Sequence, residues 1–399
     1  MNINEPYLFI SINEEEIYFF SIKFSEGLHY KILDSTFVKS HGVDNGKIIN
    51  IEVLSNLIKN NLILIEKKIG FTFHNATLIN DQDNFDCINV SGFKKLHGTQ
   101  VLDKDISYIL NNIKKIIVEN EPQSSIIHLL NSDFILDNIS YKDLPTNLHG
   151  DFYNQHLTFF LLPKNDLRNI KLVLNRCNIN VERIILKSFL KGIYKINKDN
   201  KKNNFSIIHI GKNKCNISIF KNSSFVFFQK FSFGSKIIFK DVAKLCSLNI
   251  TVVEKIFDNI CIDEVDPQKN KFLDQKYFTE GAVRKISLEH LSEISRYRIE
   301  EIISLIYKKN INLKSFTKDI NQIYLSFEDT SVYHNLKKTF KNQFSKPVNV
   351  VTEVIDKEEN LHSCIAAAEL VGKGWEKEAI PTIYGKKSKI SRFFKAIFN

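Results

Sequence analysis

Hydrophobic and polar residues alternate in short runs at the start of the chain. Residues 6–12 (PYLFISI) and 17–23 (IYFFSIK) form two predicted strands joined by a polar turn, and 30–38 can form a third. From residue 51 the apolar positions take the spacing of an amphipathic helix. Its predicted buried face is Ile51, Leu54, Leu57, Ile58, Leu62 and Ile65.

The remaining pattern predicts two successive cycles of strands and helices. In the first cycle, strands are predicted at 126–131, 156–162 and 181–186. Helices are predicted at 165–177 and, after the last of these strands, to about 196. After the polar segment 197–204, the second cycle has predicted strands at 205–210, 216–220, 224–231 and 323–327, and helices at 235–246, 250–258, 287–309 and 361–371. Each cycle opens with a strand–turn–strand unit, which predicts two α/β halves with mixed sheets covered by helices. The pattern alone also leaves open an interaction module with an unrelated α/β fold.

Composition limits the classes of function. The chain has 399 residues, enough for two or three domains with a large core. Its six cysteines form no C-x-x-C pair, so we expect neither a disulfide framework nor a zinc site. The formal charge of +10 suggests nucleic acid, but no stretch in the body of the chain interleaves aromatic and basic residues. We therefore expect no nucleic-acid partner.

Export and membrane-spanning signals are missing from the sequence pattern. The N-terminal residues MNINEPYLFISINEEEIYFF have no basic start and carry Glu within the apolar stretch, so we expect no signal peptide. No window of about 18 residues is apolar and uncharged, so we expect no membrane-spanning helix. Positive charge is concentrated at the C-terminus instead.

The order of several local patterns resembles FtsA, the bacterial actin-like cell-division protein. The matching stretches, in the family's order, are HGVDNGKIINIEVLSNLI (41–58), INVSGFKKL (88–96), SSIIHLLNSDFILDN (124–138), FSFGSKIIFKDVAKLCSL (231–248) and VRKISLEHLSEISRYRIEEIISLI (283–306), followed by the C-terminal tail. The resemblance implies an α/β fold of the actin, Hsp70 and sugar-kinase type. It also implies an FtsA-type inserted subdomain, which that family uses for self-assembly, and a C-terminal amphipathic helix.

The family's subdomains can be carried over to this sequence. The implied boundaries are 1–72 and 163–200 for the first actin-like subdomain (1A), 73–162 for the inserted subdomain (1C, SHS2-like), 201–235 and 320–375 for the second actin-like subdomain (2A), 236–319 for the helical subdomain (2B), 376–385 for a linker and 386–399 for a membrane-targeting helix.

The two phosphate-binding turns of the actin fold are altered in this sequence. In the family, each turn offers backbone N–H groups of glycines to phosphate and an Asp to Mg²⁺. The first turn resembles Asp-Ile-Gly-Ser-Ser-Lys, and the matching residues here are Ser11, Ile12, Asn13, Glu14, Glu15 and Glu16. The second resembles Asp-Ile-Gly-Gly-Gly-Thr-x-Asp, and the matching residues here are His209, Ile210, Gly211, Lys212, Asn213, Lys214, Cys215 and Asn216.

The rest of the implied nucleotide pocket keeps some of the family's residues and replaces others. The family's third loop, a Gly-Gly pair, aligns with Phe327 and Glu328, and Phe257 stands where a Lys often sits. The candidate positions of this degenerate pocket are Ser11, Asn13, Glu16, His209, Gly211, Lys212, Lys214, Gly234, Glu254 and Phe327. They predict no cofactor or weakly bound ATP and Mg²⁺, and no catalysis, because no carboxylate stands at the matched metal positions. A misaligned loop, or phosphate contacts from the two lysines, are the alternatives.

Residues 386–399 (KKSKISRFFKAIFN) have the pattern of an amphipathic helix. One stripe of it consists of Ile390, Phe393, Phe394, Ile397 and Phe398. Five cations surround the stripe: Lys386, Lys387, Lys389, Arg392 and Lys395. This combination is typical of a helix that lies in an anionic membrane surface. A helix that docks on the protein's own core, or on a partner, is the alternative.

The resemblance also implies a partner. In FtsA the helical subdomain binds the C-terminal peptide of FtsZ, the tubulin-like ring protein, which is partly acidic and partly apolar. An acidic peptide needs Arg donors beside an apolar groove. The candidate contact residues here are Arg284, Arg298, Glu301 and Ile302. An ordinary solvent-exposed helix with core isoleucines is the alternative.

The sequence therefore predicts a self-assembling adaptor that tethers the FtsZ ring to the cytoplasmic face of the bacterial inner membrane at the division site. Expected partners are FtsZ, further copies of the chain, other division proteins and an anionic membrane surface. We do not expect an enzyme. The alternatives are a scaffold of the PilM type, which shares the actin-like core, and a nucleotide-binding actin-like ATPase or sugar kinase.

Overall fold

The computed structural model describes residues 5–25, 29–44, 46–199, 204–264, 271–278, 284–345, 347–355 and 358–379. The chain divides into two compact units, and each is described by itself. The first consists of 1–202, 222–227 and 357–399, and the second of 203–221 and 228–356.

The first unit contains a five-stranded sheet in the order β11-β6-β1-β2-β3. Its strands are β1 (Pro6–Ile12), β2 (Glu16–Phe24), β3 (Tyr30–Lys39), β6 (Asn75–Asn80) and β11 (Asn180–Leu186), and the short hairpin of β4 (Val43–Asp44) and β5 (Lys47–Ile48) follows β3. The first three strands pair antiparallel, whereas β6 pairs parallel with both β1 and β11. The sheet is therefore mixed.

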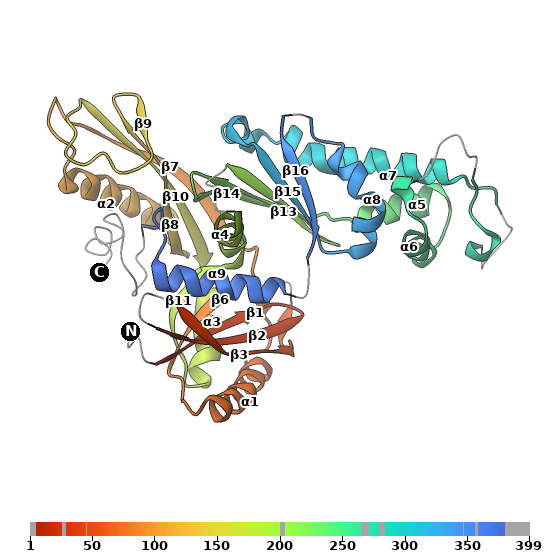
Figure 1. Cartoon of the computed structure of the whole chain (residues 1–399), viewed down its shortest axis with the longest axis horizontal. Helices are drawn as coiled ribbons and strands as arrows, with labels where there is room; N and C mark the ends of the chain where they lie inside the picture. Colours follow the sequence, from red (N-terminus) through yellow and green to blue (C-terminus); the bar gives the residue numbers. More distant parts are fainter. Residues whose placement is uncertain are drawn as a thin grey trace. The chain divides into compact units, whose positions relative to one another are not determined.

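Helices cover both faces of this first sheet. They are α1 (Ile51–Ile69), α3 (Lys164–Arg176), α4 (Lys187–Asp199) and α9 (Glu359–Lys373). Helices α1 and α3 pack together, as do α4 and α9, and Figure 1 shows α1 and α9 on opposite faces. Local chemistry sets the ends of α1: the Asn50 side chain accepts from Val53 N at its start, and Gly70, with φ of +72°, ends it.

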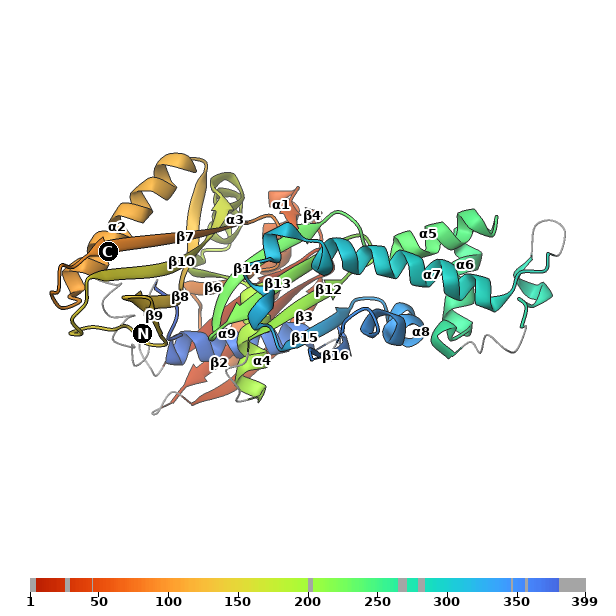
Figure 2. The ribbon, with the colours of Figure 1, turned by 90° about the horizontal axis from the view of Figure 1, so that it is seen from above.

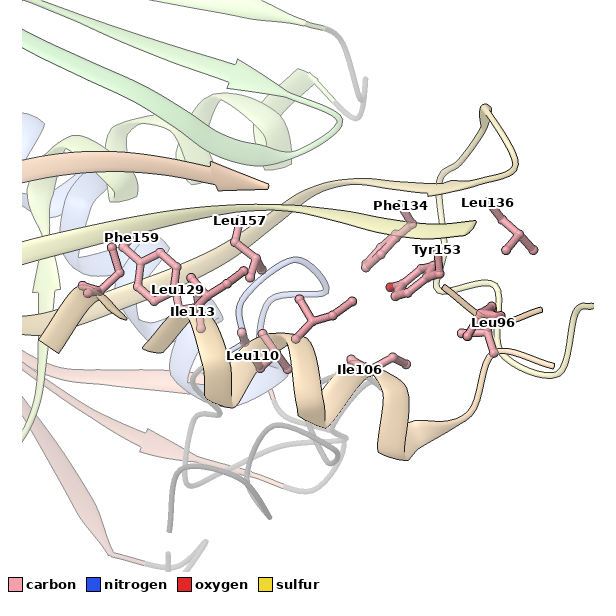
Figure 3. Close-up of a cluster of buried hydrophobic side chains, with 14 of the residues drawn as sticks. Leu96, Ile106, Leu110, Ile113, Leu129, Phe134, Leu136, Tyr153, Leu157 and Phe159 are labelled. Carbon is pink, nitrogen blue, oxygen red and sulfur yellow. The ribbon is translucent and has the colours of Figure 1, made fainter. Parts of the chain in front are cut away.

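A second sheet in the first unit has the order β7-β10-β8-β9. Its elements are β7 (Asp86–Lys95), β8 (Ser124–Leu136), β9 (Ile139–Tyr141), β10 (Phe152–Pro163) and the covering helix α2 (Asp103–Asn120). Figure 3 shows Ile106, Leu110 and Ile113 of α2 directed toward the side chains of the strands. The strand side of this core includes Leu129, Phe134, Tyr153, Leu157 and Phe159. Burial of these side chains holds the helix on the sheet.

The third sheet has the order β14-β13-β12-β15-β16. Its strands are β12 (Phe205–Ile210), β13 (Cys215–Lys221), β14 (Ser224–Phe231), β15 (Gln322–Phe327) and β16 (Asn349–Val354). Strands β12 and β13 form an antiparallel hairpin, and β12, β15 and β16 run parallel. Reading outward from the hairpin, this is the same strand order as in the first sheet, so the two halves share one topology.

The second unit also contains a group of helices. They are α5 (Lys236–Leu245), α6 (Ile250–Asn259), α7 (Leu288–Ile303) with the π-helical turn η4 (Ser304–Lys308), α8 (Thr330–Lys341), and the 3-10 turns η2 (Ile262–Glu264), η3 (Gln275–Tyr277), η5 (Ile311–Leu313) and η6 (Thr317–Asp319). Helices α5, α6 and α7 lie side by side in Figures 1 and 2, and α5 contacts both of the others. Within the described ranges, no helix is long and apolar enough to cross a bilayer.

The structure confirms the predicted fold class: two α/β halves, each opening with a hairpin ahead of parallel strands. Three predicted boundaries need correction. Strand β6, assigned from the sequence to the inserted segment 73–162, pairs with β1 in the first sheet. Helix α9, assigned to 320–375 of the second half, packs against α4, β1 and β2 of the first unit. Its small side chains Ala366, Ala367 and Ala368 are buried, which permits this close contact.

The third correction concerns the predicted linker 376–385, whose first residues are docked. Ala379 N donates to Leu129 O at 2.7 Å, and Asn131 N donates to Lys377 O at 2.8 Å, so this segment pairs antiparallel with β8. Lys377 Nζ donates to Lys142 O, and Trp375 Nε1 donates to Ser223 O at 2.7 Å. The chain is therefore fixed to the second sheet up to Ala379.

A buried ion cluster holds the same segment. The Glu378 side chain is 2% exposed; one carboxylate oxygen accepts from Arg183 of β11 and the other lies 2.8 Å from His128 Nδ1 of β8. Leu186 N donates to His128 Nε2 at 3.1 Å, so a neutral His128 carries its proton on Nδ1 and donates it to Glu378. The cluster links the first sheet, the second sheet and the docked segment.

Replacing Glu378 by Gln should lower the free energy of unfolding at pH 7 by about 3 kcal/mol or more, because Arg183 loses its buried partner. Burial alone would raise the pKa of Glu378, but Arg183 and His128 outweigh it and hold the pKa below the ordinary value of 4.5. A folded-state pKa below the unfolded-state pKa stabilises the protein above pH 4.5, and this stability is lost as pH falls through the folded-state pKa.

Urea unfolding of the wild type and of Glu378→Gln, from pH 7 to pH 3, measures the loss of unfolding free energy and its dependence on pH. The difference between the two proteins should shrink below pH 4.5. Glu119→Gln, which removes an exposed carboxylate 3.8 Å from Lys115, is the matched control and should change little. A Glu378→Gln protein as stable as the wild type at pH 7 would contradict the assignment.

Gly92 of β7 should be required for close packing of α2. A Cβ at this position would clash with Ile109 Cγ2 and lie 2.5 Å from Ile113 Cδ1. Gly92→Ala should therefore cost about 1–3 kcal/mol of overpacking, partly offset by about 0.5–1 kcal/mol from the stiffer unfolded chain. Denaturant unfolding measures this loss of unfolding free energy. Ser91→Ala, at the exposed neighbouring position, is the control. A Gly92→Ala protein more stable than the wild type would show that α2 can move away freely.

Candidate functional site

The turn between β12 and β13 is the first candidate site in the second unit. Strand register pairs Ile210 with Cys215, and Gly211 N donates to Lys214 O at 3.0 Å, which closes the turn. Gly211 is buried, whereas Lys212 and Lys214 are exposed. A Cβ on Gly211 would lie 2.6 Å from Lys214 O, so only glycine fits here.

Glu328 reaches into this turn from the end of β15. Its Oε2 accepts from Lys212 N at 2.8 Å. The same oxygen would lie 2.7 Å from a Cβ on Gly211, which places the carboxylate against the glycine itself. A carboxylate oxygen therefore takes the backbone N–H group that a bound phosphate oxygen would take in such a turn.

The start of α5 closes the other side of the turn. Ser235 N donates to Gly211 O at 2.8 Å, and Lys236 N donates to Lys212 O at 3.0 Å. Gly234 permits the contact, because a Cβ there would lie 2.5 Å from Lys212 O. The first N–H groups of a helix are a common anion-binding site, but here carbonyl groups of the turn use them.

Charge and burial in the turn both disfavour a phosphate. A phosphate oxygen about 4 Å from Glu328 would be repelled by about 4 kcal/mol per pair of unit charges at an effective dielectric constant of about 20. Burial, with a contribution from Glu328, raises the pKa of the neighbouring Cys215 thiol to about 12. The side chain of Phe327 is buried against Tyr333 and Phe340. The described residues of this turn do not fit ATP phosphates in this conformation.

The β1–β2 turn of the first unit is also satisfied internally. Asn13 Oδ1 accepts from Glu15 N at 2.9 Å and from Glu16 N at 2.7 Å, which makes this an Asx turn. Ser11 is fully buried, and the Glu16 carboxylate accepts from Asn360 of α9. The N–H groups of two turn residues thus point to an Asn side chain of the same turn.

An ion cluster that the sequence analysis missed lies at the carboxyl ends of the parallel strands in the first unit. Asp81 follows β6, and Lys187 follows β11; Lys187 Nζ is 2.8 Å from Asp81 Oδ2 and 3.4 Å from Glu359 Oε2. Lys191 Nζ is 2.8 Å from Glu359 Oε1. Burial alone would lower the pKa of Lys187, but Asp81 and Glu359 outweigh it and raise the pKa above its ordinary value.

This cluster is balanced, because its two ammonium groups face two carboxylates. The carboxyl ends of parallel strands are where α/β proteins usually bind ligands, and here they are closed by ion pairs. A sequence signal was present: both Asp81 and Lys187 come directly after a strand. It was lost when β6 was assigned to the inserted subdomain.

The other predicted nucleotide positions are distributed as follows. His209 and Gly234 lie beside Gly211, since His209 Nε2 would be 3.1 Å from a Cβ on Gly211. Glu254 is exposed on α6, and none of the described hydrogen bonds of the turn involves it. The predicted membrane-binding residues, Lys387, Lys389, Ile390, Arg392, Phe393, Phe394, Lys395, Ile397 and Phe398, lie outside the described residues.

The predicted partner residues separate into three roles. Arg284 donates to Cys246 O and Ser247 O at the end of α5, which satisfies carbonyl groups of the helix terminus. Ile302 is 1% exposed, which corrects its assignment as a partner contact: it packs in the helical core. Arg298 and Glu301 are both on the surface of α7.

Arg298 and Glu301 line a groove between α5 and α7 with a volume of about 330 Å³. The other lining residues are Asp241, Leu245, His290, Glu293, Ile294 and Tyr297. Asp241 comes 57 residues before Arg298, so no local sequence pattern predicts that the two pair. The hydrogen bond from Arg298 to Asp241 raises the pKa of the guanidinium above its ordinary value.

Comparison with known proteins finds relatives of low sequence identity. No family model matches the chain. Cell division protein FtsA of Buchnera aphidicola subsp. Schizaphis graminum is 21% identical over 280 residues, which cover 69% of this chain and 66% of the relative. Cell division protein FtsA of Rhizobium meliloti is 23% identical over 287 residues, covering 67% of this chain and 61% of the relative. The match spans less than two thirds of the length of these relatives.

A solved structure extends the comparison to the fold. A chain described as part of the PilM-PilN type IV pilus biogenesis complex aligns with a TM-score of 0.53 at 8% identity, covering 91% of this chain and 96% of that chain. At this identity the likeness shows the fold alone, which is actin-like. Taken with the sequence similarity to FtsA, it shows that the chain is a divergent FtsA-like protein with the actin fold.

Proposed function

We propose that this protein is a cell-division adaptor that attaches the FtsZ ring to the cytoplasmic face of the bacterial inner membrane without a nucleotide switch. The similarity to FtsA supports the cell-division part. The observation that carries the nucleotide-independent part is the Glu328 carboxylate, hydrogen-bonded to Lys212 N where a phosphate would be held. The adaptor assembles with copies of itself and with other division proteins, and it is not an enzyme.

The build of the two turns supports the proposed loss of ATP binding. To admit a phosphate, the second turn must release Glu328 from Lys212 N and then hold the phosphate near that carboxylate. The first turn must release two N–H groups from Asn13 and place three consecutive glutamates near the phosphates. Each step costs free energy that the lysines of the second turn would have to offset.

The membrane attachment is assigned to the C-terminal tail, 386–399. Burying one large apolar side chain contributes about 1.5–3 kcal/mol when complete, and each cation near an anionic surface adds about 1 kcal/mol. Partial burial and the ordering of the helix reduce this sum, so a single tail binds reversibly. Several tails in one assembly bind far more tightly through avidity, which couples assembly to attachment without ATP.

Two other functions would be favoured by the opposite results of the experiments below. A scaffold of the PilM type shares the fold, but a likeness of fold alone does not favour it over FtsA-like adaptors. An actin-like ATPase needs turns that are free to hold phosphate.

The tail prediction concerns binding to vesicles. The full chain should sediment with vesicles of phosphatidylglycerol and phosphatidylcholine, and much less with phosphatidylcholine alone, whereas a chain ending at Gly385 should stay in solution. Phe394→Asp should weaken binding because it removes an apolar anchor and adds a negative charge. Ser391→Asp adds the same charge outside the apolar stripe and should weaken binding less. Equal sedimentation of the truncated chain would refute the anchor and favour the PilM-like reading.

The nucleotide prediction concerns thermal stability. A ligand at 100 times its Kd adds about 2.7 kcal/mol to the stability of the folded state, which raises the Tm measurably. Millimolar ATP with Mg²⁺ should leave the Tm of the wild type unchanged, and vesicle binding should not depend on ATP. Glu328→Gln removes the charge and keeps the size, and Glu119→Gln, far from both turns in the sequence, is the exposed control. A clear rise of the wild-type Tm with ATP would show that the turns open, and would favour an actin-like ATPase over the nucleotide-independent adaptor.

A further inference from the structure

Strand β3 lies at an edge of the first sheet. Among the strands that the structure describes, it pairs with β2 alone, and it runs for ten residues from Tyr30 to Lys39 (Figure 1). The outward N–H and C=O groups of an edge strand can pair with another strand, so proteins usually shorten such edges or protect them with Pro or charge. Strand β3 is long and contains no Pro, and its two lysines, Lys31 and Lys39, stand near its ends.

Two exposed apolar side chains lie between these lysines. Ile32 is 44% exposed and Phe37 is 69% exposed. Ile32 is paired with Ile22 of β2. Phe37 is paired with Tyr18, and the two rings stack with their centres 6.5 Å apart. Ile22 and Tyr18 are an even number of positions apart on β2, so all four side chains point to the same face of the sheet.

A β-bulge in β3 produces this alignment. The register between β2 and β3 shifts by one residue at Leu33, between the pairs made by Ile32 and Asp34. Ile32 and Phe37 are an odd number of positions apart, which in a regular strand would put them on opposite faces. The extra residue brings them to one face. Asp34 points to the other face, where it forms an ion pair with Lys68 of α1.

The apolar positions of this edge are complementary to those of a second copy of the chain. When two β3 strands lie antiparallel about a two-fold axis at Ser35, Ile32 of each copy lies opposite Phe37 of the other. Side chains opposite each other in an antiparallel pair must point to the same face. The bulge at Leu33 meets this requirement in both copies, so two apolar pairs form across the contact.

The charges of the strand fit the same arrangement. Lys39 lies opposite Tyr30 of the second copy, and Lys31 lies opposite Val38, so no lysine faces another lysine. Without the bulge, the same axis would put Lys31 opposite Lys39, and like charges directly opposite each other destabilise a strand pair. The bulge therefore selects a pairing that matches the apolar positions and separates the cations.

We propose that two copies of this chain associate through β3, which joins their first sheets into one sheet across a two-fold axis at Ser35. The contact lies outside the inserted segment 73–162, which the resemblance connected with self-assembly. A contact of one strand edge is smaller than a standard interface of about 1,600 Å², so we expect a weak dimer. A dimer on a membrane carries two tails, and avidity strengthens both contacts. This last consequence rests on the proposed membrane attachment, whereas the dimer itself depends only on β3.

Sedimentation velocity of the full chain without lipid, over a series of rising protein concentrations, tests the dimer. The wild type should pass from monomer to dimer. Phe37→Lys should weaken the association about tenfold or more, because it removes an apolar pair and puts a cation opposite Ile32. Phe93→Lys is the matched control, since Phe93 is 68% exposed on β7, the edge strand of the second sheet. A wild type that stays monomeric, or equal effects of the two variants, would overturn the proposal.

A charge pair tests the register and separates loss of the contact from loss of the fold. Ile32→Glu alone should also weaken the association. Ile32→Glu combined with Phe37→Lys should restore much of it, because a carboxylate then lies opposite an ammonium group in both pairs. A variant weakened only by unfolding would not be restored in this way. A double variant that associates no better than the single variants would refute the register.

A cysteine on the axis tests the symmetry directly. Ser35 is exposed, and opposite residues of an antiparallel pair have Cα atoms about 4.5–5.5 Å apart, which a disulfide can span. After mild oxidation of the full chain, non-reducing electrophoresis should show a covalent dimer of Ser35→Cys. The controls are the wild type, with its six native cysteines, and Ser91→Cys, at an exposed position of β7. As much covalent dimer from either control would contradict an axis at Ser35.

Vesicle sedimentation separates this inference from the adaptor function. At equal protein concentration, Phe37→Lys should bind anionic vesicles more weakly than Phe93→Lys, although both add one positive charge, because its particles carry one tail instead of two. If the wild type dimerises but does not bind vesicles, the β3 contact stands and the membrane attachment is wrong. If both variants bind vesicles equally while only Phe37→Lys is monomeric, the attachment stands and the dimer has no part in it.

Discussion

One buried carboxylate, Glu378, connects parts of the first unit that lie far apart in the sequence. It pairs with Arg183 at the first sheet and with His128 at the second, while the residues on either side of it hydrogen-bond to β8. A buried charge of this kind is tolerated only when its partners are in place. The Glu378 charge is therefore compensated only where the first sheet, the second sheet and the docked segment are all in place.

The same principle explains the two altered turns. In the actin fold, the backbone N–H groups of such turns can hold a phosphate. Here Asn13 and Glu328 supply the acceptor oxygens from within the chain. The backbone N–H groups of Glu15, Glu16 and Lys212 are therefore already hydrogen-bonded to side chains of the protein itself.

The sequence predicted the elements well because alternation and helical spacing are local properties. It predicted both hairpins, most of the other strands and helices, and the buried face of α1 at Leu54, Ile58, Leu62 and Ile65, but it did not predict β6, β7, α2 or β16. It could not predict which sheet α9 would cover, because a buried alanine stripe fits either half. For the candidate sites, the sequence located the turns and the α7 surface. It missed the roles of Glu328 and Asp241, since each acts on a residue more than 50 positions away.

The docked segment has a mechanical consequence for a protein attached through its end. A pull on residues beyond Ala379 enters the fold at Ala379 N–Leu129 O and Asn131 N–Lys377 O, two hydrogen bonds of a short antiparallel pair along β8. A load along the strand stretches both bonds and the Glu378 ion pairs together, whereas a load perpendicular to it opens them one at a time. The load that the proposed attachment could bear therefore depends on the direction of the pull as well as on the strength of membrane binding.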